Sequence, residues 1–457
     1  MHGDIGMVIQ KLFSDRNFNK KMLAIVLPIT LQNLMVALVG AADTFMLCSY
    51  SQNAMAAVAL ATQVQFIQMM LTGGFLGGLS LMGAQYWGKR DIPVIEKLLA
   101  QGIWLTSLFA FAFFAGCFFV PERLMRFFAS DPELIRIGSE YLQIVAVSFI
   151  FYSISRCYLT IMRISGHVKY SVVVNILTVL LNVIFNAIFI FGLLGAPAWG
   201  VKGAAFATML AGFIEMVTVL LLSFRRDFIM LRFSRLFSWD KRLFLDFWRY
   251  TIPLLGGAML WGIGFSSYSA IIGHLGKDAA AANAIAAVAR SLGCCICDGL
   301  AAGTSIIVGH ELGAGHLRRG KLYGNRSFAL SFLVGGCTSL LLLGALPVVS
   351  SAITLTSEAH DYLRGMFYVL AVYMIGRAAS GVGINGIFAA GGDTLFNVYS
   401  IIAAMWCFAL PCAALGAFYF NWPVVVVFAC TSLDEIGKLP WLIWHYRKYK
   451  WVRNITN

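Results

Sequence analysis

Long apolar runs separated by short polar segments recur along the whole chain. Most reach or exceed about 20 residues, the length that an α-helix needs to cross the hydrocarbon core of a bilayer. A backbone exposed to lipid must satisfy its hydrogen bonds within its own segment, so these runs predict helices rather than open strands. The pattern predicts an all-α polytopic membrane protein with twelve transmembrane helices. The runs lie at about 22–48, 54–86, 98–120, 138–163, 170–194, 203–224, 248–273, 279–311, 322–346, 362–390, 396–420 and 423–445.

The composition supports this class. Of the 457 residues, 60% are hydrophobic and 12% are charged, and the mean hydropathy is +0.79. An ordinary soluble protein carries roughly 25% charged residues, so a water-soluble globular protein is excluded. The first run is longer than a signal-peptide core and no A-x-A-like cleavage site follows it, so we expect it to remain as the first helix.

The net charge of +13 indicates membrane topology rather than a nucleic-acid surface. Lys and Arg residues gather before the first run, between the sixth and seventh runs, and after the twelfth. With an even number of helices these segments lie on one side of the membrane, and the positive-inside rule makes that side cytoplasmic. We therefore expect cytoplasmic termini in a plasma membrane, such as a bacterial inner membrane, with lipid contacts and no nucleic-acid partner.

The second half of the sequence repeats the first. At an offset of 225 positions Pro28 aligns with Pro253 and Gly88 with Gly313, and alanines and glycines between them align as well. Two six-helix units in the same orientation are implied, which is a recurrent plan of secondary transporters. The expected parts are a cytoplasmic N-terminal segment (1–21), an N-terminal lobe (22–224), a cytoplasmic linker (225–247), a C-terminal lobe (248–446) and a cytoplasmic tail (447–457).

Several motifs give the repeat a family resemblance. The first half carries LPITLQNLMVALVGAADTFMLC, AMAAVALATQ and GAQYWGKRD; the second carries IPLLGGAML, AAAANAIAAV and IIVGHELGAGH; and LDEIGKLPWLIWHYRKYKW closes the chain. Over about 22–451 the sequence resembles the multidrug and toxic compound extrusion (MATE) family. The resemblance implies two parallel repeats forming a V-shaped central cavity, and a cation-coupled antiporter that exports amphipathic, often cationic, organic compounds.

Asp43 is the conspicuous carboxylate of the first run. It lies in the stretch LVGAADTFML, and the nearest lysines are Lys20 and Lys21. A carboxylate in mid-membrane costs roughly 2.5–3.5 kcal/mol on insertion scales, so such a group faces a cavity, finds a partner or carries a proton. A Na⁺ ion is an alternative partner, because hard cations select oxygen ligands. The resemblance implies that Asp43 is the protonation or ion site of the N-terminal lobe; a cap or brace on a neighbouring helix is the structural alternative.

Three uncharged polar residues are candidates to share this ion-coupling site. Asn182 and Asn186 lie four positions apart and so share one helix face, and Thr208 would add a hydroxyl from the sixth run. Asparagine pairs also hold helices together in lipid, which is the structural alternative. Many family members carry Asp where this chain has Asn186, so the site has one ionisable group fewer and we favour H⁺ over Na⁺ as the coupling ion. No other cofactor and no metal site is expected.

A second candidate set would bind substrate or a second ion. Glu215, without a charged neighbour in sequence, would bind a cationic group or relay protons, or else be a protonated structural residue. Asp298 is the clear mid-helix acid of the C-terminal lobe before the twelfth run. The acids that relatives place in helices 7 and 10 for Na⁺ have no match here, which argues against a Na⁺ site of that type. The set comprises Glu215, Asp298, Tyr268, Arg377 and Asn385.

Other charged residues have structural interpretations. Asp434 and Glu435 precede Lys438 by four and three positions, a spacing that favours an ion pair on one helix. Arg377 and Arg290 also need partners inside the membrane, and both Asp298 and Asp434 are candidates for either.

Two motifs and the cysteines suggest binding sites or disulfides that their spacing does not support. The G-x-G-x-x-G pattern at 381–386 lies within an apolar run rather than after a strand, so it does not predict a nucleotide site. His310, Glu311 and His316 miss the H-E-x-x-H spacing that brings two imidazoles to one zinc ion. The ten cysteines show neither a disulfide framework nor zinc-finger spacing.

Three functions follow from these patterns. The leading one is the antiporter, with small organic cations or amphipathic drugs as ligands. A flippase for lipid-linked precursors, from the same superfamily, would need a cavity rich in arginines, and the few basic residues within the runs are chiefly Arg156, Arg290 and Arg377. An intramembrane enzyme would need His, Asp or Glu clustered near one interface, so no enzyme activity is expected.

Overall fold

The structure is a computed structural model that describes residues 15–128, 131–225, 228–229, 240–352 and 355–456; the side chains at 39, 41–45, 48–50, 52 and 352 are outside this description. In these residues 11 helical stretches are long and apolar enough to cross a membrane. They match the first eleven apolar runs, which confirms the all-α class. The first six are α2 (Arg16–Tyr50), α3 (Gln52–Lys89), α4 (Ile92–Phe119), α6 (Pro132–Ile164), α7 (Val168–Phe191) and α8 (Val201–Ser223).

The second half of the chain contains more interrupted helices. The seventh to ninth runs form α10 (Lys241–Gly273), α11 (Lys277–Gly313) and α12 (Leu317–Ala352). The tenth run forms α13 (Ser357–Ser380) and the π-helical segment η2 (Gly381–Phe388), and the eleventh forms α14 (Leu395–Ile401), the π-helical η3 (Ile402–Ala409) and α15 (Leu410–Phe418). The G-x-G-x-x-G pattern is thus helical, as expected.

The twelfth run is not one continuous helix. It forms α16 (Val424–Thr431), α17 (Leu433–Ile436) and α18 (Leu439–Arg447). Pro440 explains the break before α18, because a proline ring clashes with the carbonyl four residues earlier, and that residue, Ile436, is the last of α17.

Polar residues beside the runs fix where helices begin. The Asp91 carboxylate accepts a hydrogen bond from the Val94 amide at the start of α4, over 3.4 Å. Asp131 accepts one from the Glu133 amide over 2.7 Å, and Pro132 follows as the first residue of α6, where a missing N–H leaves no bond unmade. Such caps allow short connections between long helices.

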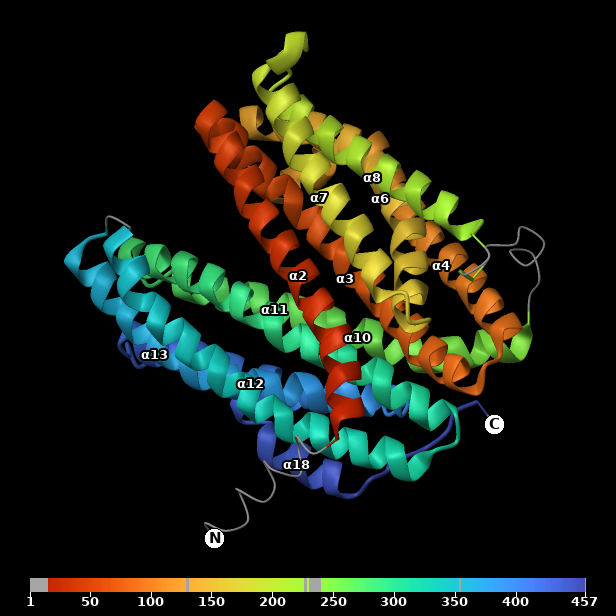
Figure 1. The fold of residues 1–457 in the computed structure, drawn as a ribbon. Coiled ribbons are helices and arrows are strands. Elements are labelled where there is room, and N and C mark those ends of the chain that lie inside the picture. The colour runs from red at the N-terminus through yellow and green to blue at the C-terminus, as the bar shows by residue number, and fades with distance from the viewer. Residues whose placement is uncertain (1–14, 129–130, 226–227, 230–239, 353–354, 457) are drawn as a thin grey trace. The chain divides into compact units, whose positions relative to one another are not determined.

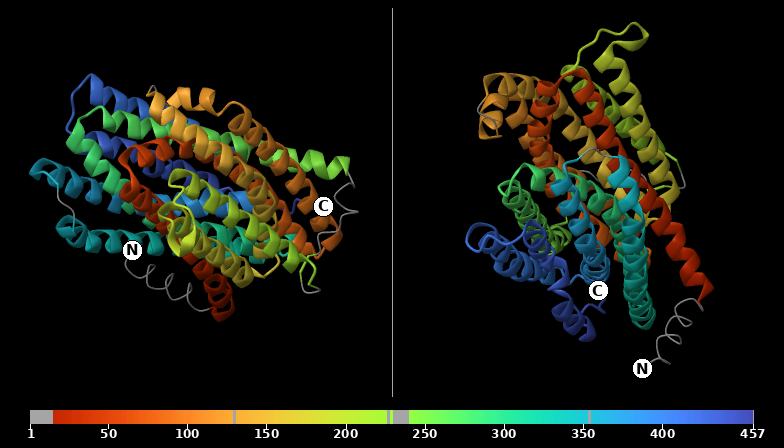
Figure 2. Two further views of the ribbon diagram at one scale, coloured as in Figure 1. Left: turned by 90° about the horizontal axis from the view of Figure 1, so that it is seen from above. Right: turned by 90° about the vertical axis from the view of Figure 1, so that its left-hand side faces the viewer.

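The chain divides into two compact units. Unit 1 comprises Met1–Asn33, Ala84–Arg90 and Ile252–Asn457, and unit 2 comprises Leu34–Gly83 and Asp91–Thr251. In unit 2, α6 packs against α4 and α8, and α7 packs against α8; in unit 1, α13 packs against α11 and α12 (Figures 1 and 2). The first turns of α2 and the last turns of α3 therefore group with the second half of the chain.

Small residues allow helices within a unit to approach closely. A Cβ atom on Gly203 of α8 would overlap the Phe189 carbonyl of α7, so glycine is required at this crossing. Without a hydrophobic driving force between helices in lipid, such close packing is a main source of helix association. It fixes the two helices that carry most of the polar side chains described next.

Candidate substrate and ion site

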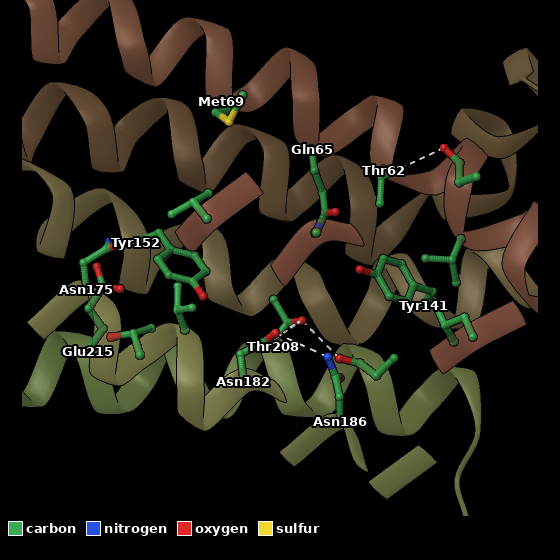
Figure 3. A pocket seen from close by; sticks show the side chains of 18 of the residues that line it. Thr62, Gln65, Met69, Tyr141, Tyr152, Asn175, Asn182, Asn186, Thr208 and Glu215 are labelled. Carbon is green, nitrogen blue, oxygen red and sulfur yellow. Dashed lines mark hydrogen bonds between the residues drawn. The ribbon is translucent and has the colours of Figure 1, made fainter. Parts of the chain in front are cut away.

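Unit 2 contains a cavity of about 520 Å³ bounded by α2, α3, α6, α7 and α8 (Figure 3). This volume lies in the range of sites that take drug-sized molecules. Apolar side chains line it together with a set of polar ones. The lining residues are Val36, Gly40, Leu47, Met55, Val58, Ala59, Thr62, Gln65, Met69, Tyr141, Tyr152, Arg156, Asn175, Thr178, Val179, Asn182, Asn186, Ala204, Thr208 and Glu215.

A hydrogen-bonded chain of polar residues runs along one wall. Asn186 Nδ2 donates to Asn182 Oδ1 over 3.3 Å, and Asn182 Nδ2 donates to Thr208 Oγ1 over 3.3 Å. The Thr208 hydroxyl donates to the Ala204 carbonyl over 3.1 Å. The structure thus brings together three residues that the sequence proposed for ion coupling, and it links α7 to α8 through them (Figure 3).

Asp43 belongs to α2, but its side chain lies outside the described residues. Its position is three residues after Gly40 and four before Leu47, both of which line the cavity. Residues at these spacings share a helix face. Because the Asp43 side chain is not described, its proximity to Asn182 and Asn186 stays a prediction.

Glu215 faces a cation that the sequence did not predict. Arg156 Nε of α6 lies 3.9 Å from Glu215 Oε1 of α8, and both residues line the cavity. The Glu215 side chain is 0% exposed and the Arg156 side chain 32% exposed. The expectation of an acid without a charged neighbour holds along the sequence but not in space, because the partner lies on another helix.

Other lining residues were missed by sequence reasoning. Tyr141, Tyr152, Asn175 and Thr178 contribute polar atoms to the wall from α6 and α7. Their signal in the sequence is weak: each is a single uncharged polar residue within an apolar run, a pattern also found at lipid-facing and core positions.

The remaining candidates for a second site lie in unit 1, whereas Glu215 lies in unit 2. Within unit 1 the structure brings Asp298 and Arg377 together: Arg377 Nη2 donates to Asp298 Oδ1 over 2.6 Å. Tyr268 is 2% exposed and packs in an apolar cluster with Ile401, Met405 and Ala409. Asn385 is an exposed residue of η2.

Asp298 and Arg377 belong to a larger ion-pair network. Arg377 Nη1 also lies 3.6 Å from Glu435 Oε1, and Lys438 Nζ lies 2.7 Å from Glu435 Oε2. The predicted ion pair on the twelfth run is thus confirmed for Glu435. Of the two acids open to Arg377, Asp298 is paired with it, and Glu435 rather than Asp434 is its second partner. The network joins α11, α13 and the α17 region.

Glu311 and His316, whose spacing misses the zinc motif, contact each other locally. His316 Nδ1 lies 3.2 Å from Glu311 Oε2 within one helix end. In the described part of the chain, no three His, Cys, Asp or Glu residues are grouped as a metal site requires.

A family model described as MatE matches residues 28–188 and 253–415. The chain belongs to the MatE family. The two matched segments begin at Pro28 and Pro253, the residues that the repeat aligns. The resemblance seen in the sequence is therefore confirmed, and the two halves are two copies of the MatE unit.

Individual relatives and solved structures agree. The chain is 22% identical over 443 residues to the uncharacterized transporter YisQ of Bacillus subtilis, covering 96% of each chain. It is 25% identical over 430 residues to the probable multidrug resistance protein NorM of Mesorhizobium japonicum, covering 87% of each. The fold is similar to that of a crystal structure of MATE in the straight conformation, with a TM-score of 0.87, 18% identity, and coverage of 97% of this chain and 98% of the other.

Proposed function

We propose that this membrane protein is an antiporter that exports amphipathic organic compounds, cations among them, in exchange for H⁺. The observation that carries the proposal is a cavity of about 520 Å³ in unit 2 whose wall combines apolar side chains with the Asn186–Asn182–Thr208 chain. The names of relatives, such as probable multidrug resistance protein NorM, support the substrate class.

The coupling ion would act at Asp43 and the polar chain beside it. Protonation of Asp43 would remove its charge and change its hydrogen bonding, and this would shift the populations of two conformations of the lobe. H⁺ is favoured over Na⁺ because Asn186 is not ionisable. Drug and proton need not touch, since both need only bias the same equilibrium.

The transporter would lie in a plasma membrane with both termini in the cytoplasm, as the distribution of basic residues indicates. It would need no cofactor besides its coupling ion and would catalyse no reaction. The flippase alternative has one feature in its favour, the Arg156 guanidinium on the cavity wall. A flippase of phosphate-linked lipids would need several such cations, and among the described residues that line this cavity Arg156 is the basic one.

Dye transport in proteoliposomes tests the proposal. A cationic fluorescent dye should be transported when a pH gradient is imposed, whereas a Na⁺ gradient alone should have no effect. Asp43→Asn should abolish transport without changing insertion or the elution profile in detergent, and Asp43→Glu should retain part of it. Full transport by Asp43→Asn, or movement of a labelled polyprenyl-linked sugar instead of dye, would overturn the proposal.

A further inference from the structure

The segment that follows α18 begins with an anchored residue. Trp451 is 0% exposed, and its indole lies so close to Gly324 of α12 that a Cβ on this glycine would overlap it. The Trp451 carbonyl lies equally close to Gly391, which follows the tenth run. These contacts all belong to the second half of the chain, so the start of the segment is fixed to the helices that precede it.

The next two residues of the segment bind the ends of two helices of the second half. Arg453 Nε donates to the Gly391 carbonyl over 2.6 Å, and Arg453 Nη2 donates to the Gly392 carbonyl. A cation is favourable beside the last carbonyls of a helix. Asn454 Nδ2 donates to the Gly313 carbonyl at the end of α11 over 3.3 Å. The segment thus runs from the end of the tenth run to the end of α11.

Residues 455 and 456 then reach α3, a helix of the first half. The Ile455 amide donates to Gln85 Oε1 over 2.8 Å, and Lys89 Nζ donates to the Thr456 carbonyl over 2.7 Å. Gln85 is 0% exposed, and its Nε2 donates to the Ala390 carbonyl over 2.7 Å. Both polar atoms of this buried side chain are therefore satisfied by groups of the second half.

The place of these contacts on α3 gives them a mechanical consequence. Residues 84–90 of α3 group with unit 1, whereas the preceding turns of the same helix group with unit 2. A movement that takes the end of α3 away from α11 must therefore break the contacts of Gln85 and Lys89. Lys89 and Arg453 are exposed residues, so water can replace their hydrogen bonds when they open. The buried Trp451 would keep the segment attached to α12 meanwhile.

We propose that residues 453–456 are a latch that holds the end of α3 against α11, and that this latch opens and closes once in each transport cycle. The inference rests on the proposed export function, in which the two sides of the membrane open in turn. After two crossings α3 ends on the side of the N-terminal segment, the side that the distribution of basic residues makes cytoplasmic. Uptake of substrate from the cytoplasm requires that side to open.

A reversible cross-link across the latch tests the proposal. Lys89→Cys together with Thr456→Cys places two thiols where the two residues now meet, and a short bis-methanethiosulfonate reagent joins them by a linker that dithiothreitol cleaves. In proteoliposomes with a pH gradient, the cross-linked protein should transport a cationic dye at least about tenfold more slowly, because the open-latch conformation is no longer populated. Dithiothreitol should restore the rate of the untreated variant, which also shows that the variant is folded.

Lys321→Cys together with Tyr449→Cys is the matched control. Lys321 Nζ lies 3.5 Å from the centre of the Tyr449 ring, so this pair joins α12 to the same segment without including α3. Its cross-linking should leave dye transport unchanged. Single-cysteine variants treated with the same reagent account for reaction at native thiols such as the exposed Cys337.

The two cross-links separate the latch from the export function. Undiminished transport by the cross-linked 89–456 variant, or an equal loss in the cross-linked control, would overturn the latch and leave the export function standing. Absence of dye transport by wild-type protein would overturn the export function, and with it the role of the latch in transport.

A second variant needs no reagent. Arg453→Gln removes the charged donor to the Gly391 and Gly392 carbonyls, so the hydrogen exchange of the Ile455 amide should become about tenfold faster, a factor typical of one hydrogen bond to a charged group. Arg318→Gln replaces another exposed arginine and should leave this rate unchanged. The same exchange rate in Arg453→Gln and wild type would show that Arg453 does not hold the latch closed and would overturn the proposal.

Discussion

Gly88 and Gly313 occupy equivalent positions of the two repeats, and each faces the backbone of the helix that carries the other. A Cβ on Gly88 of α3 would overlap the His310 carbonyl of α11, and a Cβ on Gly313 of α11 would overlap the Gln85 carbonyl of α3. Gln85 and His310 are themselves equivalent at the same offset. The internal repeat is therefore visible within unit 1, where the ends of α3 and α11 pack closely and each places its glycine against the backbone of the other.

Gly313→Ala should destabilise the protein. The added methyl group has no room at this crossing, and overpacking typically costs about 1–3 kcal/mol. The melting temperature in detergent should fall accordingly. Gly344→Ala is the matched control, because Gly344 lies in the helix α12 with open space where a Cβ would be; it should be neutral or slightly stabilising, since alanine favours helix more than glycine. Equal melting temperatures for the two variants would contradict the close packing of α3 against α11 at Gly313.

Arg377→Gln should also destabilise the fold, and more than Asp298→Asn. Arg377 is 14% exposed and forms ion pairs with both Asp298 and the buried Glu435. Its loss therefore leaves two acids with fewer partners. A hydrogen bond to a charged group is worth about 1.5–3 kcal/mol. Asp298→Asn removes one of the two acids, and Arg377 keeps its ion pair with Glu435. Thermal unfolding in detergent of both single variants and the double variant measures these effects, and a larger loss for Asp298→Asn would contradict the arrangement.

The sequence was sufficient for features that depend on spacing along one helix. The apolar runs, the Asn182–Asn186 pair and the Glu435–Lys438 ion pair were all predicted from periodicity, and the structure has each of them. Contacts between helices were only partly predictable: Asp298 was one of two candidate partners of Arg377, and the structure was needed to choose between them. Arg156 and Glu215 are far apart in sequence, and only the packing of α6 against α8 brings them together.

The helix interruptions were missed for a different reason. The run 423–445 is predominantly apolar, with Asp434, Glu435 and Lys438 near its middle, and hydropathy alone predicts one span. Its division into three short helices depends on Pro440 and on the local fit against α13 and η3, which hydropathy does not report.

Asn186→Asp should change the ion response of the proposed transporter. The new carboxylate would stand where Asn186 now donates to Asn182, and a carboxylate oxygen is a ligand that Na⁺ accepts readily. We expect a Na⁺ gradient alone to drive dye transport in this variant but not in wild type. Asn186→Gln, which keeps an amide, serves as the control. An unchanged response to Na⁺ would indicate that this position does not set the choice of ion.

Asp15 should make the stability of the fold sensitive to low pH. Its carboxylate caps α2 by accepting hydrogen bonds from the Phe18 and Asn17 amides, each over 3.1 Å, and Arg326 Nη1 donates to it over 2.6 Å. The Phe18 amide first, and then Arg326, lower the pKa of Asp15 from its ordinary value of 3.8. A lowered pKa means that the stabilisation is present above the unfolded-state pKa and is lost as the pH falls through the folded-state pKa.

Asp15→Asn should therefore lower the melting temperature at neutral pH, and the difference from wild type should shrink as the pH falls below about 4. Asp361→Asn, which replaces an exposed carboxylate, should show little difference at any pH. A difference between Asp15→Asn and wild type that stays constant down to acid pH would show that the carboxylate charge is not what stabilises this end of α2.

Trp451 should anchor the C-terminal segment to the end of α3. Its side chain is 0% exposed and fills the space that Gly324 leaves open. Beyond it, the Ile455 amide donates to Gln85 Oε1 over 2.8 Å, and Gln85 Nε2 donates to the Ala390 carbonyl over 2.7 Å. Hydrogen bonds through Gln85 thus connect the segment after α18 to α3, and α3 to the end of the tenth run, within unit 1.

Trp451→Ala should cost about 3–5 kcal/mol, the usual loss for a buried aromatic residue, and the Ile455 amide should lose its protection against hydrogen exchange because its acceptor would no longer be held in place. Trp444→Ala is the control of the same residue type, since Trp444 is 57% exposed; it should leave the exchange of Ile455 unchanged. Fast exchange at Ile455 in wild-type protein, or the same melting temperature for both variants, would show that the segment is not held by this indole.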